Sequence, residues 1–206
     1  GLGERGQKEK SQDLGTHYGK VVRIRPDGSI PADNPFAAKG GALKEIWTYG
    51  HRNIQGAALH PSTGQLWTVE HGAQGGDEIN TPRAGRNYGW PVITYGRDYS
   101  GARIGVGTAR EGMEQPVYYW DPVIAPSAAA FYTADRIPAW RGRLLVGSLT
   151  PGGLVVLTLA GGRVAGETRH LAELGRVRDL RIGPDGLVYL AIDSADAPIV
   201  RLEPSG

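Results

Sequence analysis

The 206-residue sequence contains no cysteine, one methionine and two phenylalanines. Without cysteine, neither a disulfide framework nor a thiolate metal site can form. No apolar run approaches the roughly 18 residues that a transmembrane helix needs. The 23 basic and 21 acidic side chains give a formal net charge of +2, and no Lys/Arg-rich run stands out. The sequence therefore predicts neither a membrane span nor binding to nucleic acid.

The N-terminal region also lacks the features of a signal peptide, and the chain opens on Gly1 rather than on Met. We therefore expect a cleaved, processed or trimmed chain. Residues 1–18 are polar and punctuated by glycine, without periodicity, and they read as a loop or an arm. The missing cysteines do not fix the compartment, because many periplasmic proteins also lack them.

Glycine is the abundant residue: the 32 glycines are roughly double an average share of about 7 per cent, which indicates many turns between short strands. Alternation from Val21 to Arg25 followed by Pro-Asp-Gly predicts a strand and a turn. Residues 42–49 predict another strand, and residues 57–60 and 66–69 flank the turn PSTG as a hairpin. Residues 81–115 are turn-rich, and a connection of that length is usually functional or disordered. With no amphipathic helix of ten residues, the predicted class is all-β.

Short internal repeats suggest how these strands are arranged. GKVVRIRPDG at residues 19–28 is echoed by APIVRLEPSG at 197–206 and more loosely by residues 152–162, and residues 177–202 predict three strands with a GPDG turn between the first two. Repeated short antiparallel strands favour propeller blades of about 40–50 residues and four strands each. The chain would hold about four blades, as one partial β-propeller domain over residues 1–206.

The stretch Ile46–Pro91 concentrates unlike chemistry: three Trp, three His, adjacent Asp77 and Glu78, and repeated glycine turns. Glycine lets the backbone approach a ligand closely, and carboxylates and carbonyls are the hard oxygen ligands that Ca²⁺ prefers. A set of tight turns between strands would explain the same residues. From residue types alone, both interpretations stay open.

Seven strings carry a resemblance to a known family. They are SIPADNPF, IWTYGHRNIQGAALHPSTGQLW, EHGAQGGDEIN, GRNYGWPVITYG, YYWDPVIAPS, LLVGSL and RVRDLRIGPDG, and they run in the family's order to the C-terminus. They resemble the pyrroloquinoline quinone (PQQ)-dependent glucose/sorbosone dehydrogenases, specifically the bacterial aldose sugar dehydrogenases. The resemblance implies a six-bladed β-propeller that holds PQQ and Ca²⁺ at one end of its axis. It also implies that the first blades and the catalytic His lie upstream of this chain, so no catalytic residue is expected within it.

The resemblance places cofactor contacts at six positions: Arg52, Asn53, Tyr99, Thr150, Arg176 and Arg178. Arginine suits this role because a guanidinium meets the carboxylates of PQQ bidentately. Arg176 and Arg178 would share one strand face, and their two like charges, with Asp179 on the opposite face, need an anion or solvent. Thr150 stands where some relatives carry Lys, which weakens that contact. Without the resemblance, Arg52 would be interpreted as a surface or structural residue and the Arg pair as a solvated edge.

Metal ligands are implied in the same way. Gly72 and Ala73 stand where the family offers two backbone carbonyls to the Ca²⁺ that bridges to PQQ, and Ala73 replaces a common Pro. Glu78 and the carbonyl of Tyr88 match a second, structural Ca²⁺ site. Glu70 and His71 are adjacent on a strand and face opposite ways, so they do not form an acid/base pair.

The implied function is oxidation of an aldose sugar at C1 to the lactone, with PQQ as hydride acceptor and Ca²⁺ polarising the quinone. The alternative is a non-catalytic, Ca²⁺-stabilised propeller that binds proteins or glycans, because fold does not imply function. A lactonase-like hydrolase would need a ring of carboxylates that the scattered Asp residues do not provide. The expected partners are a sugar, an artificial or respiratory electron acceptor, and a second copy or a companion chain that supplies the missing blades; the expected location is periplasmic or secreted.

Overall fold

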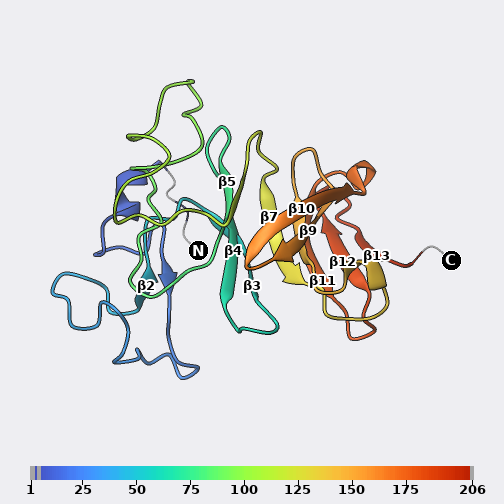
Figure 1. Cartoon of the computed structure of the whole chain (residues 1–206), viewed down its shortest axis with the longest axis horizontal. Coiled ribbons are helices and arrows are strands. Elements are labelled where there is room, and N and C mark those ends of the chain that lie inside the picture. The colour runs from blue at the N-terminus through green and yellow to red at the C-terminus, as the bar shows by residue number, and fades with distance from the viewer. Residues whose placement is uncertain (1–2, 4–5, 205–206) are drawn as a thin grey trace. The chain divides into compact units, whose positions relative to one another are not determined.

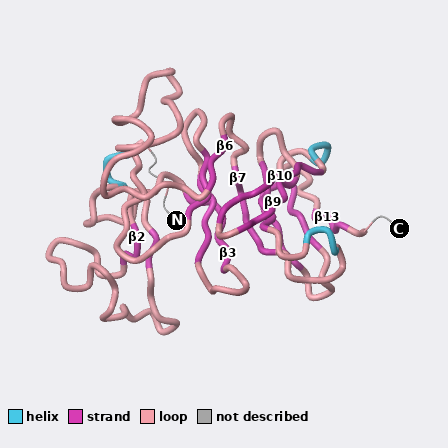
Figure 2. The backbone as a smooth tube through the Cα atoms, in the orientation of Figure 1, coloured by secondary structure: helices cyan, strands magenta, loops and turns pink. Residues whose placement is uncertain are grey.

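The computed structural model describes residue 3 and residues 6–204, and within them the chain is built from short strands and long loops (Figures 1 and 2). The strands are β1 (Val21–Val22), β2 (Ile46–Thr48), β3 (Ile54–Leu59), β4 (Leu66–Glu70), β5 (Asp77–Asn80), β6 (Tyr118–Trp120), β7 (Pro126–Phe131), β8 (Leu144–Ser148), β9 (Leu154–Ala160), β10 (Arg163–His170), β11 (Val177–Ile182), β12 (Val188–Ile192) and β13 (Ile199–Leu202). Helical turns are limited in this part of the chain to η1 (Lys8–Ser11), η2 (Pro138–Trp140) and η3 (Ala172–Leu174), all 3₁₀. None of the described helices has the length and apolar character that a membrane crossing requires.

The sheets are antiparallel meanders. Their strand orders are β1-β2, β3-β4-β5-β6, β10-β9-β8-β7 and β11-β12-β13. Consecutive strands are neighbours throughout, as expected where tight Gly/Pro turns join short strands. The predicted all-β class and the predicted four-stranded antiparallel sheets are confirmed.

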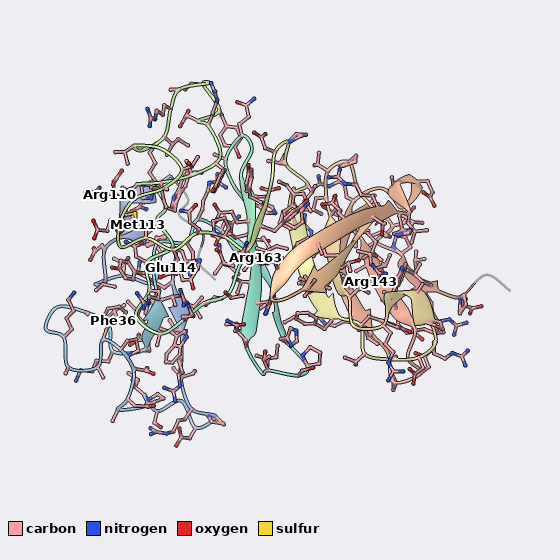
Figure 3. The ribbon with its side chains drawn as sticks, in the orientation of Figure 1. Phe36, Arg110, Met113, Glu114, Arg143 and Arg163 are labelled. Atoms are coloured by element: carbon pink, nitrogen blue, oxygen red, sulfur yellow. The ribbon has the colours of Figure 1, made fainter. Side chains whose placement is uncertain are left out.

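The chain forms two compact units: unit 1 comprises residues 1–54 and 70–122, and unit 2 comprises residues 55–69 and 123–206. In unit 1, β5 pairs with β6 through Asp77↔Trp120 and Ile79↔Tyr118. The long connection between these strands is tied down by polar contacts. Glu114, labelled in Figure 3, forms an ion pair with Arg83 and lies 3.6 Å from the Arg86 guanidinium.

The core of unit 2 lies between its sheets. Its buried members are Ala128, Tyr132, Leu145, Leu154, Val156, Val177, Leu180, Val188, Leu190 and Ile192. Strand β8 is buried along its whole length, whereas β12 alternates buried and half-buried residues, so one face of β12 packs inward. Each fully buried Leu or Val contributes about 1.5–3 kcal/mol. The Oγ of Ser127 donates to the carbonyl of Val177 at 2.6 Å and ties β7 to β11.

Several strand predictions hold and others are too long. The hairpin at 57–60 and 66–69 is present as β3 and β4, and the three predicted strands after residue 176 are β11, β12 and β13. The strand expected over 42–49 is wrong in extent, because turns occupy its first half and pairing with β1 begins at Ile46. The predicted arm (1–18) and the repeat at 197–206 lie partly outside the described residues.

Candidate functional site

A buried hydrogen bond between His51 and Glu70 lies at the centre of the polar contacts of unit 1. His51 follows β2, is 1% exposed, and donates from Nδ1 to Oε1 of Glu70 at 2.9 Å. Its Nε2 lies 2.9 Å from Oγ1 of Thr48, and its ring stacks on Tyr88 with centroids 4.6 Å apart. Both ring nitrogens are therefore engaged in the interior. This histidine is a structural element and has no reach to a substrate.

Glu70, at the end of β4, collects further donors. The backbone N–H of Arg52 donates to Oε2 at 2.8 Å, and Nδ2 of Asn80 donates to Oε1 at 2.7 Å. Burial alone would raise the pKa of Glu70, but the positive charge of His51 and these hydrogen bonds outweigh it and hold that pKa below its usual value. Glu70 is thus a buried anion that fixes the backbone where the chain enters β3.

In the loop after β4, two backbone carbonyls face the guanidinium group of Arg52. Nη1 of Arg52 donates to the carbonyl of His71 at 3.2 Å and to that of Gly72, and its guanidinium lies 5.2 Å over the Trp90 ring. The N–H of Gly72 donates to Oδ1 of Asp77 at 2.8 Å, so its carbonyl end is left to face the arginine. The loop therefore presents backbone oxygens to positive charge.

Only glycine fits at position 72. A Cβ there would lie 2.1 Å from the carbonyl oxygen of Gly75 and 2.4 Å from backbone atoms of Gly76. Since these neighbours are backbone atoms, they cannot rotate away as a side chain could. The glycine run of this loop is thus explained by close packing of the main chain.

A small cavity of about 10 Å³ lies beside this loop, and a volume of this size holds about one water-sized occupant. Its lining includes Arg52, Glu70, Gly72, Glu78 and Tyr88. Burial, together with the negative charges of Glu70 and Asp77, raises the pKa of Glu78 to about 8. Crowded carboxylates beside backbone carbonyls, around a space of ionic size, fit a hard divalent cation such as Ca²⁺.

Three of the four predicted metal ligands line this cavity, and the fourth does not. Gly72, Glu78 and Tyr88 line it, although the resemblance divided them between two sites. Ala73 does not line it and packs instead with Trp90 and Ile104. Within the described residues, no group of three or more His, Cys, Asp or Glu side chains could hold a metal, so a cation here would depend on backbone carbonyls.

Three of the predicted cofactor contacts fall in unit 1. Arg52 and Asn53 are half-buried and follow His51, and the carbonyl of Asn53 accepts the N–H of His71 at 3.0 Å. Tyr99 stands in a turn and is 75% exposed. In this unit the structure joins Arg52 and Asn53 to the His71–Gly72 loop and leaves Tyr99 in solvent.

The other three fall in unit 2. Thr150 is exposed, and its N–H donates to the carbonyl of Ile124 at 3.1 Å. Arg176 precedes β11 and Arg178 lies within it, and both guanidinium groups donate to the same oxygen of Asp193, at 3.0 and 2.7 Å. The anion that the two like charges need is therefore supplied by Asp193, a residue that the sequence analysis missed.

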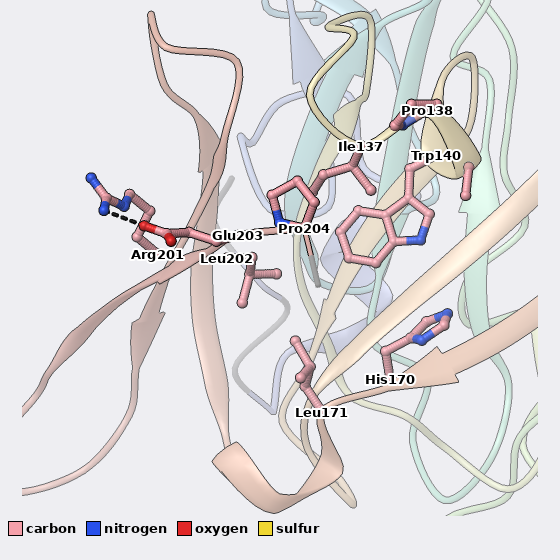
Figure 4. Close-up of a pocket in the computed structure, with 10 residues that line it drawn as sticks. Ile137, Pro138, Trp140, His170, Leu171, Arg201, Leu202, Glu203 and Pro204 are labelled. Carbon is pink, nitrogen blue, oxygen red and sulfur yellow. Dashed lines mark hydrogen bonds and ion pairs between the residues drawn. The ribbon is translucent and has the colours of Figure 1, made fainter. Parts of the chain in front are cut away.

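A larger cavity of about 420 Å³ also lies in unit 2 (Figure 4). Apolar side chains face it: Ile137, Trp140, Leu171, Leu202 and Pro204. Among its polar lining residues, Arg201 is paired with Glu203. The cavity is an extension of the apolar core and gathers no catalytic constellation.

The sequence is similar to known proteins over nearly its whole length. Residues 1–201 match the family described as Glucose / Sorbosone dehydrogenase. Aldose sugar dehydrogenase YliI of Escherichia coli (strain K12) is 44% identical over 206 residues, which cover 98% of this chain and 56% of that protein.

Solved structures are similar as well. The soluble aldose sugar dehydrogenase of Escherichia coli in the apo-form superposes with a TM-score of 0.91 at 45% identity, covering 94% of this chain and 56% of that one. The PQQ-bound form of aldose sugar dehydrogenase from Streptomyces coelicolor gives a TM-score of 0.75 at 29% identity, covering 98% and 56%. The chain spans just over half the length of these relatives, and its β-propeller fold class is confirmed.

Proposed function

Because the chain belongs to the glucose/sorbosone dehydrogenase family, we propose that it forms part of a quinoprotein that oxidises aldose sugars at C1 to lactones. The observation that carries the proposal is the loop after β4. There, carbonyls of His71 and Gly72 converge on the Arg52 guanidinium beside an ion-sized cavity that Glu78 lines. When bound, PQQ would accept a hydride and Ca²⁺ would polarise its quinone carbonyl.

Calcium would be held largely by main-chain oxygens. The carbonyls of Gly72 and Ala73 would bind the ion that contacts the cofactor, and Glu78 with the carbonyl of Tyr88 would bind the structural ion. A divalent charge would relieve the crowding that keeps the Glu78 pKa high. The buried His51–Glu70 pair would fix the backbone at Arg52 and so orient its side chain toward this loop.

The cofactor would be bound through its carboxylates. The guanidinium groups of Arg52, Arg176 and Arg178 would meet them, since planar fork-like donors match carboxylate geometry. Asn53 and Thr150 would add neutral hydrogen bonds, and the exposed ring of Tyr99 would supply a flat neighbour.

The general base would come from outside this chain. His51 is buried and engaged at both ring nitrogens, and Glu70 is held by His51, Asn80 and the Arg52 N–H, so neither has access to a sugar. We therefore expect the isolated 206-residue chain to be inactive. Its partners would be a sugar, an artificial or respiratory electron acceptor, and a second copy or companion chain, and it would act in the periplasm or outside the cell.

Dye reduction tests this function directly. The complete gene product and the 206-residue chain are each reconstituted with PQQ and Ca²⁺, supplied with glucose and other aldoses, and followed by loss of dye colour. We expect turnover in the complete product and none in the 206-residue chain. Absence of turnover in the complete product with every aldose would refute the function. Stabilisation by Ca²⁺ without any PQQ binding would instead support the non-catalytic propeller.

A further inference from the structure

Three charged side chains meet at one end of the β11–β12 hairpin. Nε of Arg176 and Nη2 of Arg178 both donate to Oδ2 of Asp193, at 3.0 and 2.7 Å. The backbone brings them together: Val177 pairs with Ile192, and the N–H of Asp193 donates to the carbonyl of Arg176 at 2.8 Å. The sheet register thus sets one carboxylate opposite two arginines.

The Asp193 carboxylate neutralises only part of the positive charge of the two arginines. One negative charge faces two positive charges, so the cluster keeps a net charge of +1. The side chains of Arg176 and Arg178 stay 49% and 47% exposed, so the cluster is accessible to solvent. Nη1 of Arg176 also reaches the carbonyl of Leu149 at 3.4 Å, beside Thr150. The cluster is therefore a fixed, cationic and accessible donor surface.

We propose that Asp193 is a positioning residue that holds Arg176 and Arg178 in one orientation for a carboxylate of a flat, polyanionic cofactor. This inference rests on the proposed function, in which the two arginines contact PQQ. Asp193 itself does not touch the cofactor. It acts by cancelling the repulsion between the two guanidinium groups and by restricting their rotamers before the ligand arrives.

Two physical effects of Asp193 have opposite signs, and this makes the inference testable. As a nearby negative charge, Asp193 repels an anionic ligand, so its neutralisation alone would strengthen binding. As a clamp, it lowers the ordering cost of two long side chains, so its loss would weaken binding. The positioning role predicts that the second effect is larger, with affinity for PQQ falling roughly five- to tenfold.

The experiment compares Asp193→Asn with Asp179→Asn in the 206-residue chain. Asp179 is the matched control because it lies on the same sheet, has a side chain that is 44% exposed, and pairs with a single arginine, Arg181, at 2.7 Å. Both variants remove one negative charge and keep one acceptor oxygen. PQQ affinity is measured by quenching of Trp fluorescence at fixed Ca²⁺ and ionic strength, and urea midpoints verify folding.

A third variant, Asp193→Glu, keeps the charge but moves the carboxylate by one methylene. We expect Asp193→Asn and Asp193→Glu both to weaken binding and Asp179→Asn to leave it unchanged. Wild-type or tighter binding by Asp193→Asn would overturn the inference, as would equal weakening by Asp179→Asn. In those outcomes the wild-type chain still binds PQQ, so the proposed function survives. A wild-type chain that does not bind PQQ overturns both.

Discussion

Replacing Glu70 with Gln tests the buried network that fixes Arg52. The carboxylate accepts from His51 and Asn80 on one oxygen and from the Arg52 N–H on the other. In Glu70→Gln, the amide oxygen still accepts the first two donors, but without a charge, and the amide N–H₂ opposes the Arg52 N–H. A buried donor without an acceptor costs about 1–3 kcal/mol, and two bonds lose their charge assistance. We therefore expect a loss of about 3 kcal/mol in the free energy of unfolding.

Urea unfolding followed by Trp fluorescence measures this loss. With a denaturant slope of roughly 2 kcal/mol/M, the midpoint should fall by about 1.5 M. Glu111→Gln is the control, since Glu111 is exposed in a turn and its substitution should change stability by less than about 0.5 kcal/mol. A loss below about 1 kcal/mol for Glu70→Gln would show that this network does not stabilise the loop as argued.

Two further predictions concern the other parts of the site. Gly72→Ala should lower the free energy of unfolding by about 1–3 kcal/mol and abolish stabilisation by Ca²⁺ in a thermal melt, because its Cβ would overlap the carbonyl of Gly75. Gly40→Ala is the control: open space surrounds that position, so the same melt should be unchanged. The pKa of the Asp193 carboxyl lies below its usual 3.8 because of hydrogen bonds from Arg178 and Arg176, so any stability it contributes is present above pH 3.8 and lost as pH falls through the lowered value. In Arg178→Gln, carboxyl NMR titration should give a higher Asp193 pKa, and an unchanged value would contradict the pairing.

Local patterns in the sequence were sufficient for the hairpins. The turn PSTG between apolar alternations placed β3 and β4, and the GPDG turn placed β11 and β12, because turn chemistry acts over a few residues. The strand at 42–49 was predicted too long because its extent depends on a partner. Only the residues from Ile46 onward pair with β1, and the residues before Ile46 form turns instead.

Contacts between distant residues were harder to predict. His51 and Glu70 lie 19 residues apart, and no spacing rule places a side chain after β2 against the end of β4. The contact of Arg176 and Arg178 with Asp193 could have been predicted from the sequence, because the GPDG turn indicates the strand register. Counting back from the GPDG turn along antiparallel strands sets Asp193 opposite the start of β11, and only the register shift near Val177 had to be supplied by the structure.

Titration of the 206-residue chain with PQQ, with and without Ca²⁺, tests the central claim most directly. Trp90 lies against the Arg52 guanidinium, so binding near this loop should quench Trp fluorescence. We predict saturable quenching with a Kd of about 1 μM or tighter, weakened when Ca²⁺ is removed. Quenching that does not saturate, or that is indifferent to Ca²⁺, would contradict the assignment of this loop as the seat of a calcium-held quinone cofactor.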